Sequence, residues 1–163
     1  PGPLFTVKIP ETDAVSEIKR AIVLETVQDP GNVGTVIRTA NAFGMDAVIL
    51  TGDCADIYNP KTVRATMGAI FRQRVITCTL DGLRALLEKN RLPLYGAALS
   101  DRARDIRGVE LKNAAAAIGS EGQGLSRALL DMCESELIIP MQPGSESLNA
   151  GIAAAVVMWE MSR

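Results

Sequence analysis

Short apolar runs alternate with segments of helical periodicity along most of the chain. The runs predict strands at residues 21–27, 47–51, 74–78, 92–99, 114–119 and 136–141. Most of the segments between them carry apolar residues at helical spacing. Almost continuously apolar strands that alternate with helices are typical of parallel sheets, because helices bury both faces of such a sheet. The pattern therefore predicts an α/β fold with an open, mostly parallel sheet flanked by helices.

Two of the expected helices differ in how their apolar residues are distributed. In the helix expected at residues 31–44, the apolar stripe consists of Val33, Val36, Ile37, Ala40 and Phe43. Thr35 and Arg38 fall on the other side of this helix, so Arg38 is expected to face away from the core. The last segment, residues 147–161, is apolar almost all round and contains Trp159. Such a helix is expected to be buried or to form a subunit interface.

The pattern also indicates how the chain is organised. Residues 1–20 are polar and contain proline, which predicts an extended lead-in or the remnant of a linker. Residues 21–163 then form one domain. A chain of 163 residues is long enough to bury about two-thirds of its unfolded surface in a single core.

Composition narrows the chemistry that the chain can perform. There is no histidine, which excludes a Ser-His-Asp triad, a Cys-His pair and a histidine-based zinc site. Cys54, Cys78 and Cys133 are odd in number and far apart, which is typical of small buried residues in a reducing compartment. No apolar run approaches the roughly 20 residues needed to cross a bilayer. We therefore expect a cytoplasmic protein with neither a metal centre nor a membrane contact.

Basic residues form two local clusters in a chain whose net charge is −2 and whose pI is about 5.2. That balance argues against a strongly cationic nucleic-acid binder. The aromatic content of 4% also disfavours a platform that stacks many bases. The first cluster, which follows the helix-start signal Asn59-Pro60, contains Lys61, Arg64, Arg72 and Arg74, and the second contains Arg102, Arg104 and Arg107. Each cluster is either a solvated face or a contact for RNA.

Three loops after predicted strands hold the candidate chemistry, because ligands of open α/β sheets bind beyond the carboxyl ends of strands. Residues 28–34 lead into the helix of Arg38, and the N-terminus of that helix suits a phosphate. Residues 119–124 read G-x-x-G-x-G, which is neither a dinucleotide-binding motif nor a P-loop, and a purely structural turn remains an alternative. Residues 139–149 enter the last helix, where Ser147 or Asn149 could act as a cap.

Together, these loops and the helices that follow them resemble the SpoU (TrmH-like) branch of the SPOUT RNA methyltransferases. The matching stretches are DPGNVGTVIRTANAFG, IGSEGQGLS and IPMQPGSESLNAGIAAA, in this order and at comparable spacing. The resemblance extends from about residue 21 to the end of the sequence. Three ordered motifs are far more specific than any single glycine-rich turn.

The resemblance implies properties that periodicity and composition do not show. The C-terminal part is expected to form a deep trefoil knot that builds the cofactor site, an exception to the usual rule of unthreaded connections. S-adenosylmethionine is the implied cofactor, and a homodimer is the implied assembly. The implied reaction is transfer of a methyl group to a ribose 2′-hydroxyl of RNA, in rRNA rather than tRNA. Relatives usually carry a separate N-terminal RNA-binding domain, and residues 1–20 are too few to form one.

The resemblance also implies roles for individual residues. Those implied to hold the cofactor are Ala97, Ala98, Leu99, Gly119, Ile139, Met141, Ser147, Leu148 and Asn149. Those implied in catalysis are Asn32, Arg38, Glu121 and Asn149, and Arg38 is implied in RNA binding as well. The first basic cluster adds Lys61 and Arg64 as candidate RNA contacts. Since a guanidinium is not deprotonated in proteins, we expect Arg38 to clamp a phosphate and to stabilise the developing alkoxide. The proton would leave to phosphate, water or Glu121.

Two alternative functions remain open from the sequence. A domain with this fold could bind RNA or the cofactor without transferring a methyl group. The joint presence of Asn32, Arg38, Glu121, Ser147 and Asn149 disfavours that alternative. The methyl group could instead go to a base nitrogen of the RNA.

Overall fold

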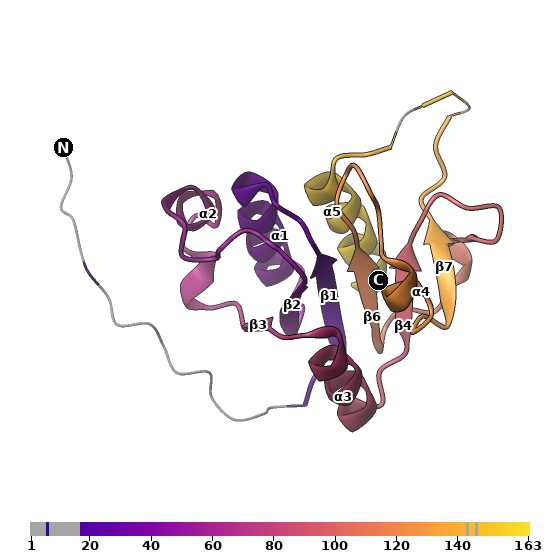
Figure 1. Cartoon of the computed structure of the whole chain (residues 1–163), viewed down its shortest axis with the longest axis horizontal. Helices are drawn as coiled ribbons and strands as arrows, with labels where there is room; N and C mark the ends of the chain where they lie inside the picture. The colour runs from indigo at the N-terminus through magenta and orange to yellow at the C-terminus, as the bar shows by residue number, and fades with distance from the viewer. Residues whose placement is uncertain (1–5, 7–16, 143, 146) are drawn as a thin grey trace.

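A single parallel sheet forms the centre of the molecule (Figure 1). The computed structural model describes residue 6 and residues 17–142, 144–145 and 147–163. The strands within these residues are β1 (Arg20–Glu25), β2 (Ala47–Thr51), β3 (Val75–Thr77), β4 (Leu94–Ala97), β5 (Arg104–Asp105), β6 (Ala114–Ile118) and β7 (Ser135–Ile138). They lie in the order β3-β2-β1-β6-β4-β7-β5, and all neighbouring pairs are parallel. The predicted α/β class with an open parallel sheet is confirmed.

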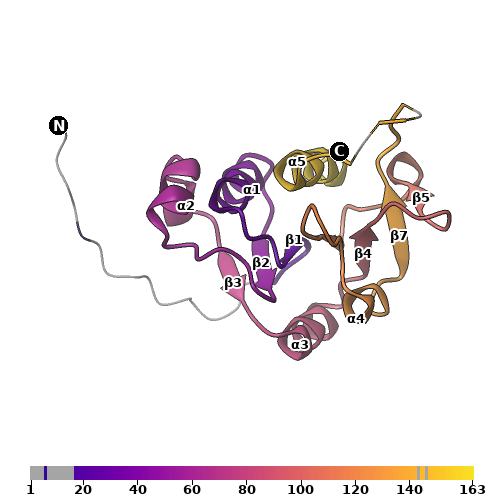
Figure 2. The ribbon, with the colours of Figure 1, turned by 45° about the horizontal axis from the view of Figure 1, so that its top comes forward.

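Helices cover both faces of this sheet, as the pattern predicts. They are α1 (Pro30–Ala42), α2 (Pro60–Ala65), α3 (Leu80–Asn90), α4 (Arg127–Leu130) and α5 (Ala150–Met161), with the short 3-10 helices η1 (Ala69–Phe71) and η2 (Ile106–Gly108). Figure 2 shows α1 and α5 on one face of the sheet and α3 and α4 on the other. Helix α2 packs beside α1 at the edge of the first face.

Alternate residues of the central strands belong to two separate cores. In β1, Ile22 and Leu24 pack with apolar residues of α1 and α5. Ala21 and Val23 point to the opposite face and pack with apolar residues of α3 and α4. Every residue of β1 after Arg20 is buried. Two buried faces therefore explain why the sequence shows continuous apolar runs rather than alternation.

The helices begin at the signals that the sequence contains. Asp29 caps α1 by accepting a hydrogen bond from the backbone N–H of Asn32 (2.8 Å), and Pro30 is the first residue of the helix. Asn59 caps α2 in the same way. The amphipathic pattern of α1 is confirmed as well, because Arg38 is exposed while the apolar stripe contacts the core.

The structure differs from the expected strands mainly at their ends and at the sheet edge. Strand β5 leaves no apolar run in the sequence, because both of its residues are exposed where it pairs with β7. The strand expected at 92–99 is confined to Leu94–Ala97, and those expected at 74–78 and 136–141 are shorter as well. The trefoil knot stays a prediction. Most of the expected lead-in at residues 1–20 lies outside the described residues.

Helix α5 is buried on one side only. Its buried apolar side chains include Ala154, Val157 and Met158. Its exposed apolar side chains are Ile152, Val156 and Trp159. The expectation that this helix is fully buried is therefore wrong for a single chain. The other interpretation, a subunit interface, remains open.

Candidate functional site

One cavity of about 440 Å³ opens at the carboxyl ends of β4, β6 and β7. Its lining residues fall within segments 97–100, 118–130, 136–141 and 147–153. In Figure 1 the loops that follow β6 and β7 leave the sheet at the same end. The volume is within the range of sites for small organic ligands, roughly 300–1,000 Å³. The cavity also lies where ligands of open parallel sheets bind.

The residues that the resemblance assigns to the cofactor meet at this cavity. Those that line it are Ala97, Ala98, Leu99, Gly119, Ile139, Met141, Ser147 and Leu148. Asn149 stands at the rim, between the lining residues Leu148 and Ala150. The structure thus brings together residues from four separate segments, and their role in holding a cofactor stays a prediction.

The turn after β6 requires glycine at residue 119. A Cβ atom there would lie 2.1 Å from the carbonyl carbon of Gly124 and 2.2 Å from its oxygen, far inside contact distance. The turn closes through a hydrogen bond from the N–H of Gly124 to the carbonyl oxygen of Ser120 (2.9 Å). By contrast, a Cβ on Gly122 would meet nothing within 4 Å. The motif therefore builds a wall of main-chain atoms in which one glycine is sterically required.

A cluster of polar side chains joins the three motifs at the edge of the cavity. Oε1 of Glu121 accepts hydrogen bonds from Nδ2 of Asn32 and from Nδ2 of Asn149, the latter at 3.3 Å. Nδ2 of Asn149 also donates to Oδ1 of Asn32 (3.0 Å), and the N–H of Ala150 donates to Oε1 of Glu121 (3.4 Å). The carboxylate thus lies between the N-termini of α1 and α5, where the helix dipoles favour a negative charge.

Asn149 has a structural role besides its place in this cluster. Its Oδ1 accepts hydrogen bonds from the N–H groups of Gly151 (3.0 Å) and Ile152 (3.2 Å), so it caps α5. The cap expected at Ser147 or Asn149 is confirmed at Asn149. Because the oxygen is held by the helix, the amide nitrogen is directed toward Asn32 and Glu121. Capping and participation in the site are therefore not alternatives for this residue.

The cations assigned to catalysis or RNA binding lie outside the polar cluster. Arg38 is six residues beyond Asn32 on α1, about 9 Å along the helix axis. It is exposed and makes no hydrogen bond or ion pair with any part of the chain that the structure describes. Lys61 and Arg64 are exposed on the neighbouring helix α2. The structure therefore brings Asn32, Glu121 and Asn149 together, while these cations face solvent.

The second basic cluster lies outside the cavity lining. Arg107 forms an ion pair with Asp105 (2.6 Å) in which both side chains are largely exposed. The hydrogen bonds from this guanidinium lower the pKa of Asp105. Arg102 and Arg104 are exposed too, and none of the three residues lines the cavity.

Glu25 supports the site although none of the three motifs contains it. It ends β1, it is only 5% exposed, and its carboxylate accepts hydrogen bonds from the N–H and Oγ of Ser126, both at 2.6 Å. Ser126 caps α4 and follows the glycine-rich turn that carries Glu121. Glu25 therefore anchors the far end of this turn to the central strand. The two partners are 101 residues apart, so spacing could not have revealed the pair.

Glu136 is a second residue that the motifs miss. It lines the cavity from β7, and Oγ of Ser100 donates a hydrogen bond to its Oε2 (2.5 Å). A carboxylate inside a short strand that is otherwise mostly apolar was a usable signal. Glu121 lines the cavity too, so the lining contains two carboxylates, which suits a cationic ligand.

None of the three cysteines lines the cavity. Burial, together with the charges of Glu136 and Glu25, raises the pKa of Cys133 to about 12. Burial also raises the pKa values of Cys54 and Cys78. Since the thiolate is the reactive form, these thiols are poor nucleophiles near neutral pH.

Two further findings concern the described residues only. Within them, no group of three or more His, Cys, Asp or Glu side chains could hold a metal ion. None of the helices they form has the length and apolar character required to span a membrane.

Comparison with known proteins identifies the family of this chain. A model of the SpoU rRNA Methylase family matches residues 19–159. The chain belongs to this family, as its motifs predict. Among curated relatives, the 23S rRNA (guanosine(2553)-2'-O)-methyltransferase RlmP of Bacillus subtilis (strain 168) is 35% identical over 149 residues. That match covers 91% of this chain and 60% of RlmP.

Solved structures of similar proteins share this fold. The SpoU methyltransferase AviRb from Streptomyces viridochromogenes, in complex with the cofactor AdoMet, has a TM-score of 0.87 and 28% identity over 96% of this chain and 66% of AviRb. The AdoMet-bound rRNA methyltransferase from Sinorhizobium meliloti has a TM-score of 0.84 and 30% identity over 90% of this chain and 56% of that protein. The chain thus spans between 56% and 66% of the length of these three relatives.

Proposed function

We propose that this chain is the catalytic part of an S-adenosylmethionine-dependent RNA methyltransferase that acts on a ribose 2′-hydroxyl. One observation carries the proposal: three motif loops meet at a single cavity, with Asn32, Glu121 and Asn149 joined at its edge. The names of the relatives support it, since RlmP is named a 2'-O-methyltransferase and two similar structures are described as AdoMet complexes.

The cavity suits a ligand that combines an apolar ring system with positive charge. Its walls contain small or apolar residues such as Ala97, Ala98 and Ile139, so that main-chain N–H and C=O groups can reach a ligand. The carboxylates of Glu121 and Glu136 add negative charge to the lining. We therefore assign the binding of S-adenosylmethionine to this cavity.

The polar cluster suits the proton transfer that the reaction needs. S-adenosylmethionine supplies a methyl group on a positively charged sulfonium, and the ribose hydroxyl must lose its proton to accept that group. Oε1 of Glu121 is occupied by Asn32, Asn149 and Ala150. Oε2 has no hydrogen-bond partner among the described residues and is therefore available to the hydroxyl. In this proposal the two amides hold the carboxylate at the orientation in which it receives the proton.

Arg38 acts on the RNA backbone in this proposal. Its guanidinium stays charged at any physiological pH and can hold a phosphate with two hydrogen bonds. A phosphate held next to the reacting ribose positions the hydroxyl, and the positive charge stabilises the alkoxide as it develops. Bound RNA would thus connect α1 with the cavity. Lys61 and Arg64 would extend the same contact along α2.

We further propose a homodimer formed through α5 and the adjoining end of α1. Ile152, Val156 and Trp159 form an exposed apolar stripe on α5. Trp159, which is 57% exposed, packs edge to face against Phe43 with ring centroids 5.6 Å apart. A stripe that spans two helices is typical of a surface covered by another subunit. Light scattering should give the mass of two chains, whereas the mass of one chain would contradict the assembly.

We propose rRNA in preference to tRNA as the substrate, and the cytoplasm as the compartment. The family is described by rRNA methylation, and RlmP is named for a site in 23S rRNA. The cysteines are all free thiols, as a reducing compartment allows.

Transfer of a labelled methyl group tests the proposed function. The protein is incubated with S-adenosylmethionine carrying a labelled methyl group and with separate rRNA and tRNA fractions. The RNA is then digested to nucleosides and analysed by mass spectrometry. We expect the label in 2′-O-methylnucleosides, mainly from rRNA. Retention of the cofactor without transfer would indicate a binding domain, and label in the bases would indicate a base methyltransferase; either result would overturn the proposal.

A further inference from the structure

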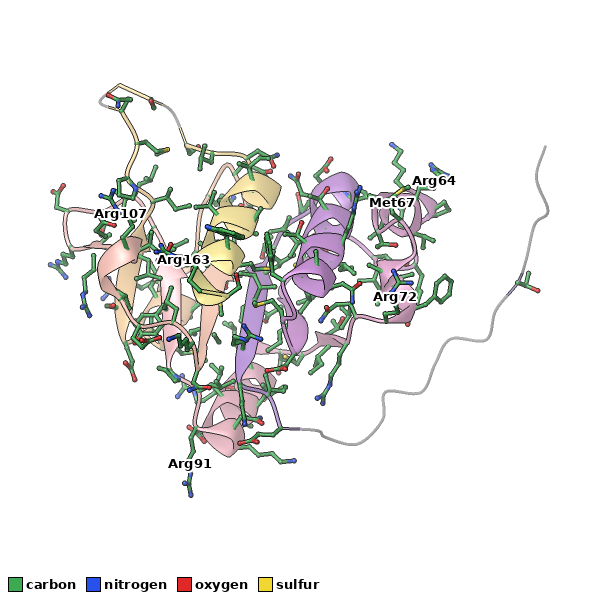
Figure 3. All side chains as sticks on the ribbon, turned by 180° about the vertical axis from the view of Figure 1, so that it is seen from behind. Arg64, Met67, Arg72, Arg91, Arg107 and Arg163 are labelled. Atoms are coloured by element: carbon green, nitrogen blue, oxygen red, sulfur yellow. The ribbon has the colours of Figure 1, made fainter. Side chains whose placement is uncertain are left out.

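Five exposed side chains form a surface on the outer side of α2 and η1, which we call the α2–η1 ledge. They are Lys61, Arg64, Met67, Phe71 and Arg72. Met67 is 72% exposed and Phe71 is 64% exposed, which is unusual for large apolar side chains. Figure 3 shows Arg64, Met67 and Arg72 at the same edge of the molecule, well away from Arg91 at the end of α3. The ledge therefore presents apolar and cationic groups to solvent together.

The ledge is cationic although the chain as a whole is acidic. Residues 57–80 contain Lys61, Arg64, Arg72 and Arg74 but no Asp or Glu, whereas the net charge of the chain is −2. Cations gathered on one surface match the evenly spaced phosphates of a nucleic acid. A purely apolar partner would gain nothing from them. Charge complementarity thus favours RNA as the occupant of the ledge.

Buried polar side chains fix the backbone that carries the ledge. Oγ1 of Thr62 donates a hydrogen bond to the carbonyl oxygen of Asp56 (2.8 Å). Nε2 of Gln73 donates to the carbonyl oxygen of Met45 (3.1 Å). Thr62, Thr66 and Gln73 are all buried, although each of them is next to an exposed residue of the ledge. Because this backbone is already ordered, little conformational entropy is lost when a ligand binds to it.

The turn between α2 and η1 holds Met67 outward. The φ of Met67 is +48° and that of Gly68 is +83°, so both residues are in the left-handed region. A residue with a side chain rarely adopts this conformation. Exposure of an apolar side chain is unfavourable as well. The combination of the two at one residue indicates a side chain that is presented for contact.

Helix α2 is fixed to the helix that carries Asn32 and Arg38. A Cβ atom on Gly34 of α1 would lie 2.5 Å from Cβ of Ala65 and 2.6 Å from the carbonyl oxygen of Thr62. Glycine at this position therefore lets the two helices pack in direct contact. The ledge consequently keeps a fixed position relative to Arg38.

We propose that the α2–η1 ledge binds an unpaired segment of RNA. The choice of RNA as the ligand rests on the proposed function. Phe71 and Met67 pack against the face of one unstacked base, and Lys61, Arg64 and Arg72 contact the flanking phosphates. Bases within a duplex are stacked and do not offer their faces, so the ledge selects unpaired RNA. The low aromatic content of the sequence disfavours a platform for many bases, but a single ring suffices for one.

Binding to paired and unpaired RNA tests this inference. The probe is a short fluorescent RNA without self-complementarity, measured alone and annealed to its complement by fluorescence anisotropy. The double variant Met67→Ala with Phe71→Ala should weaken binding of the unpaired RNA by about tenfold or more, because stacking on a base is lost. Binding of the duplex should change little. Both substitutions are at exposed positions, and a thermal melt verifies that the variant folds.

Two sets of variants separate the contribution of stacking to RNA affinity from the contributions of charge and of apolar side-chain size. Phe71→Trp should retain the affinity for unpaired RNA, whereas Phe71→Leu, which keeps an apolar side chain without a ring, should lose most of it. Arg64→Gln and Arg72→Gln should each reduce the slope of log affinity against log salt by about 0.7. Arg91→Gln, at an exposed position far from the ledge, should leave the slope unchanged.

Each outcome decides the inference. Selective loss for unpaired RNA supports it, while equal loss for both RNAs, or no loss, overturns it. A double variant that changes from dimer to monomer would assign the ledge to a second copy of the chain and would also overturn it. Cofactor affinity and methyl transfer are measured on the same samples. If the wild type selects unpaired RNA through the ledge but transfers no methyl group, the proposed function fails while the ledge stands.

Discussion

The two sides of the candidate site present different chemical groups. The cavity at the ends of β4, β6 and β7 consists largely of main-chain atoms and small side chains, and it depends on close contacts such as that between Gly119 and Gly124. The side formed by α1 and α2 presents amides and cations, among them Asn32, Arg38 and Arg64. Substitutions should therefore act through shape on the cavity side, where they change affinity and folding. On the helical side they should act through chemistry and change the rate or RNA binding.

The largest effect is expected from Gly119→Ala on the cavity side. The added Cβ would meet backbone atoms of Gly124, which cannot rotate away as a side chain could. We expect a loss of stability of about 1–3 kcal/mol or more and loss of detectable S-adenosylmethionine binding. Thermal melts and isothermal titration calorimetry measure the two effects. Gly122→Ala in the same turn, where nothing lies within 4 Å, is the control and should behave like the wild type.

Arg38→Ala should have the largest effect on the helical side. Loss of the guanidinium removes the phosphate clamp and the charge that stabilises the alkoxide, so kcat should fall by about 10²–10³-fold. Cofactor affinity and melting temperature should stay close to those of the wild type. Arg38→Lys should restore little activity, because an ammonium cannot form the two parallel hydrogen bonds of a guanidinium. A large loss of cofactor affinity in Arg38→Ala would contradict the expectation that the helical side affects the rate and RNA binding rather than cofactor binding.

Glu25→Gln tests the support behind the cavity. An amide can accept only one of the two hydrogen bonds that Ser126 donates to the buried carboxylate, so stability should fall by about 1–3 kcal/mol. Cofactor affinity should fall with it, because the glycine-rich turn loses its anchor. Denaturant unfolding and calorimetry measure both. Glu110→Gln, at an exposed carboxylate outside the cavity, is the control, and an equal loss there would show that the anchor has no special role.

Asn149→Asp is expected to have the smallest effect and to separate the two roles of this residue. The aspartate can still accept the hydrogen bonds that cap α5, so the melting temperature should hardly change. It cannot donate to Asn32 and Glu121, and its charge repels Glu121, so kcat should fall about tenfold. A variant with full activity would reduce Asn149 to a helix cap.

The same contrast explains how much the sequence could predict. The three motif loops could be predicted because glycines, helix caps and strand ends are signals in the local sequence. The structure brings these loops to one cavity. The Asn59-Pro60 and Asp29-Pro30 helix starts are local signals too. The partner of Glu25 could not be predicted, because Ser126 lies 101 residues away in the sequence. Strand β5 could not be predicted either, because its two residues are exposed and polar and form a strand only by pairing with β7.

The α2–η1 ledge could not be predicted from the sequence for another reason. In the sequence, Met67 and Phe71 resemble ordinary core residues. The structure exposes both side chains, and it places Met67 in a left-handed turn that the sequence does not announce. Tertiary structure decides whether an apolar residue is core or surface. Lys61 and Arg64, by contrast, could be proposed as RNA contacts from their charge and spacing alone.

A crystal structure of the protein with S-adenosylmethionine tests the central claim most directly. The account predicts the cofactor in the cavity beside Gly119, Met141 and Leu148, with its methyl group directed toward the cluster of Asn32, Glu121 and Asn149. A cofactor bound elsewhere, or one whose methyl group points away from these three residues, would contradict it.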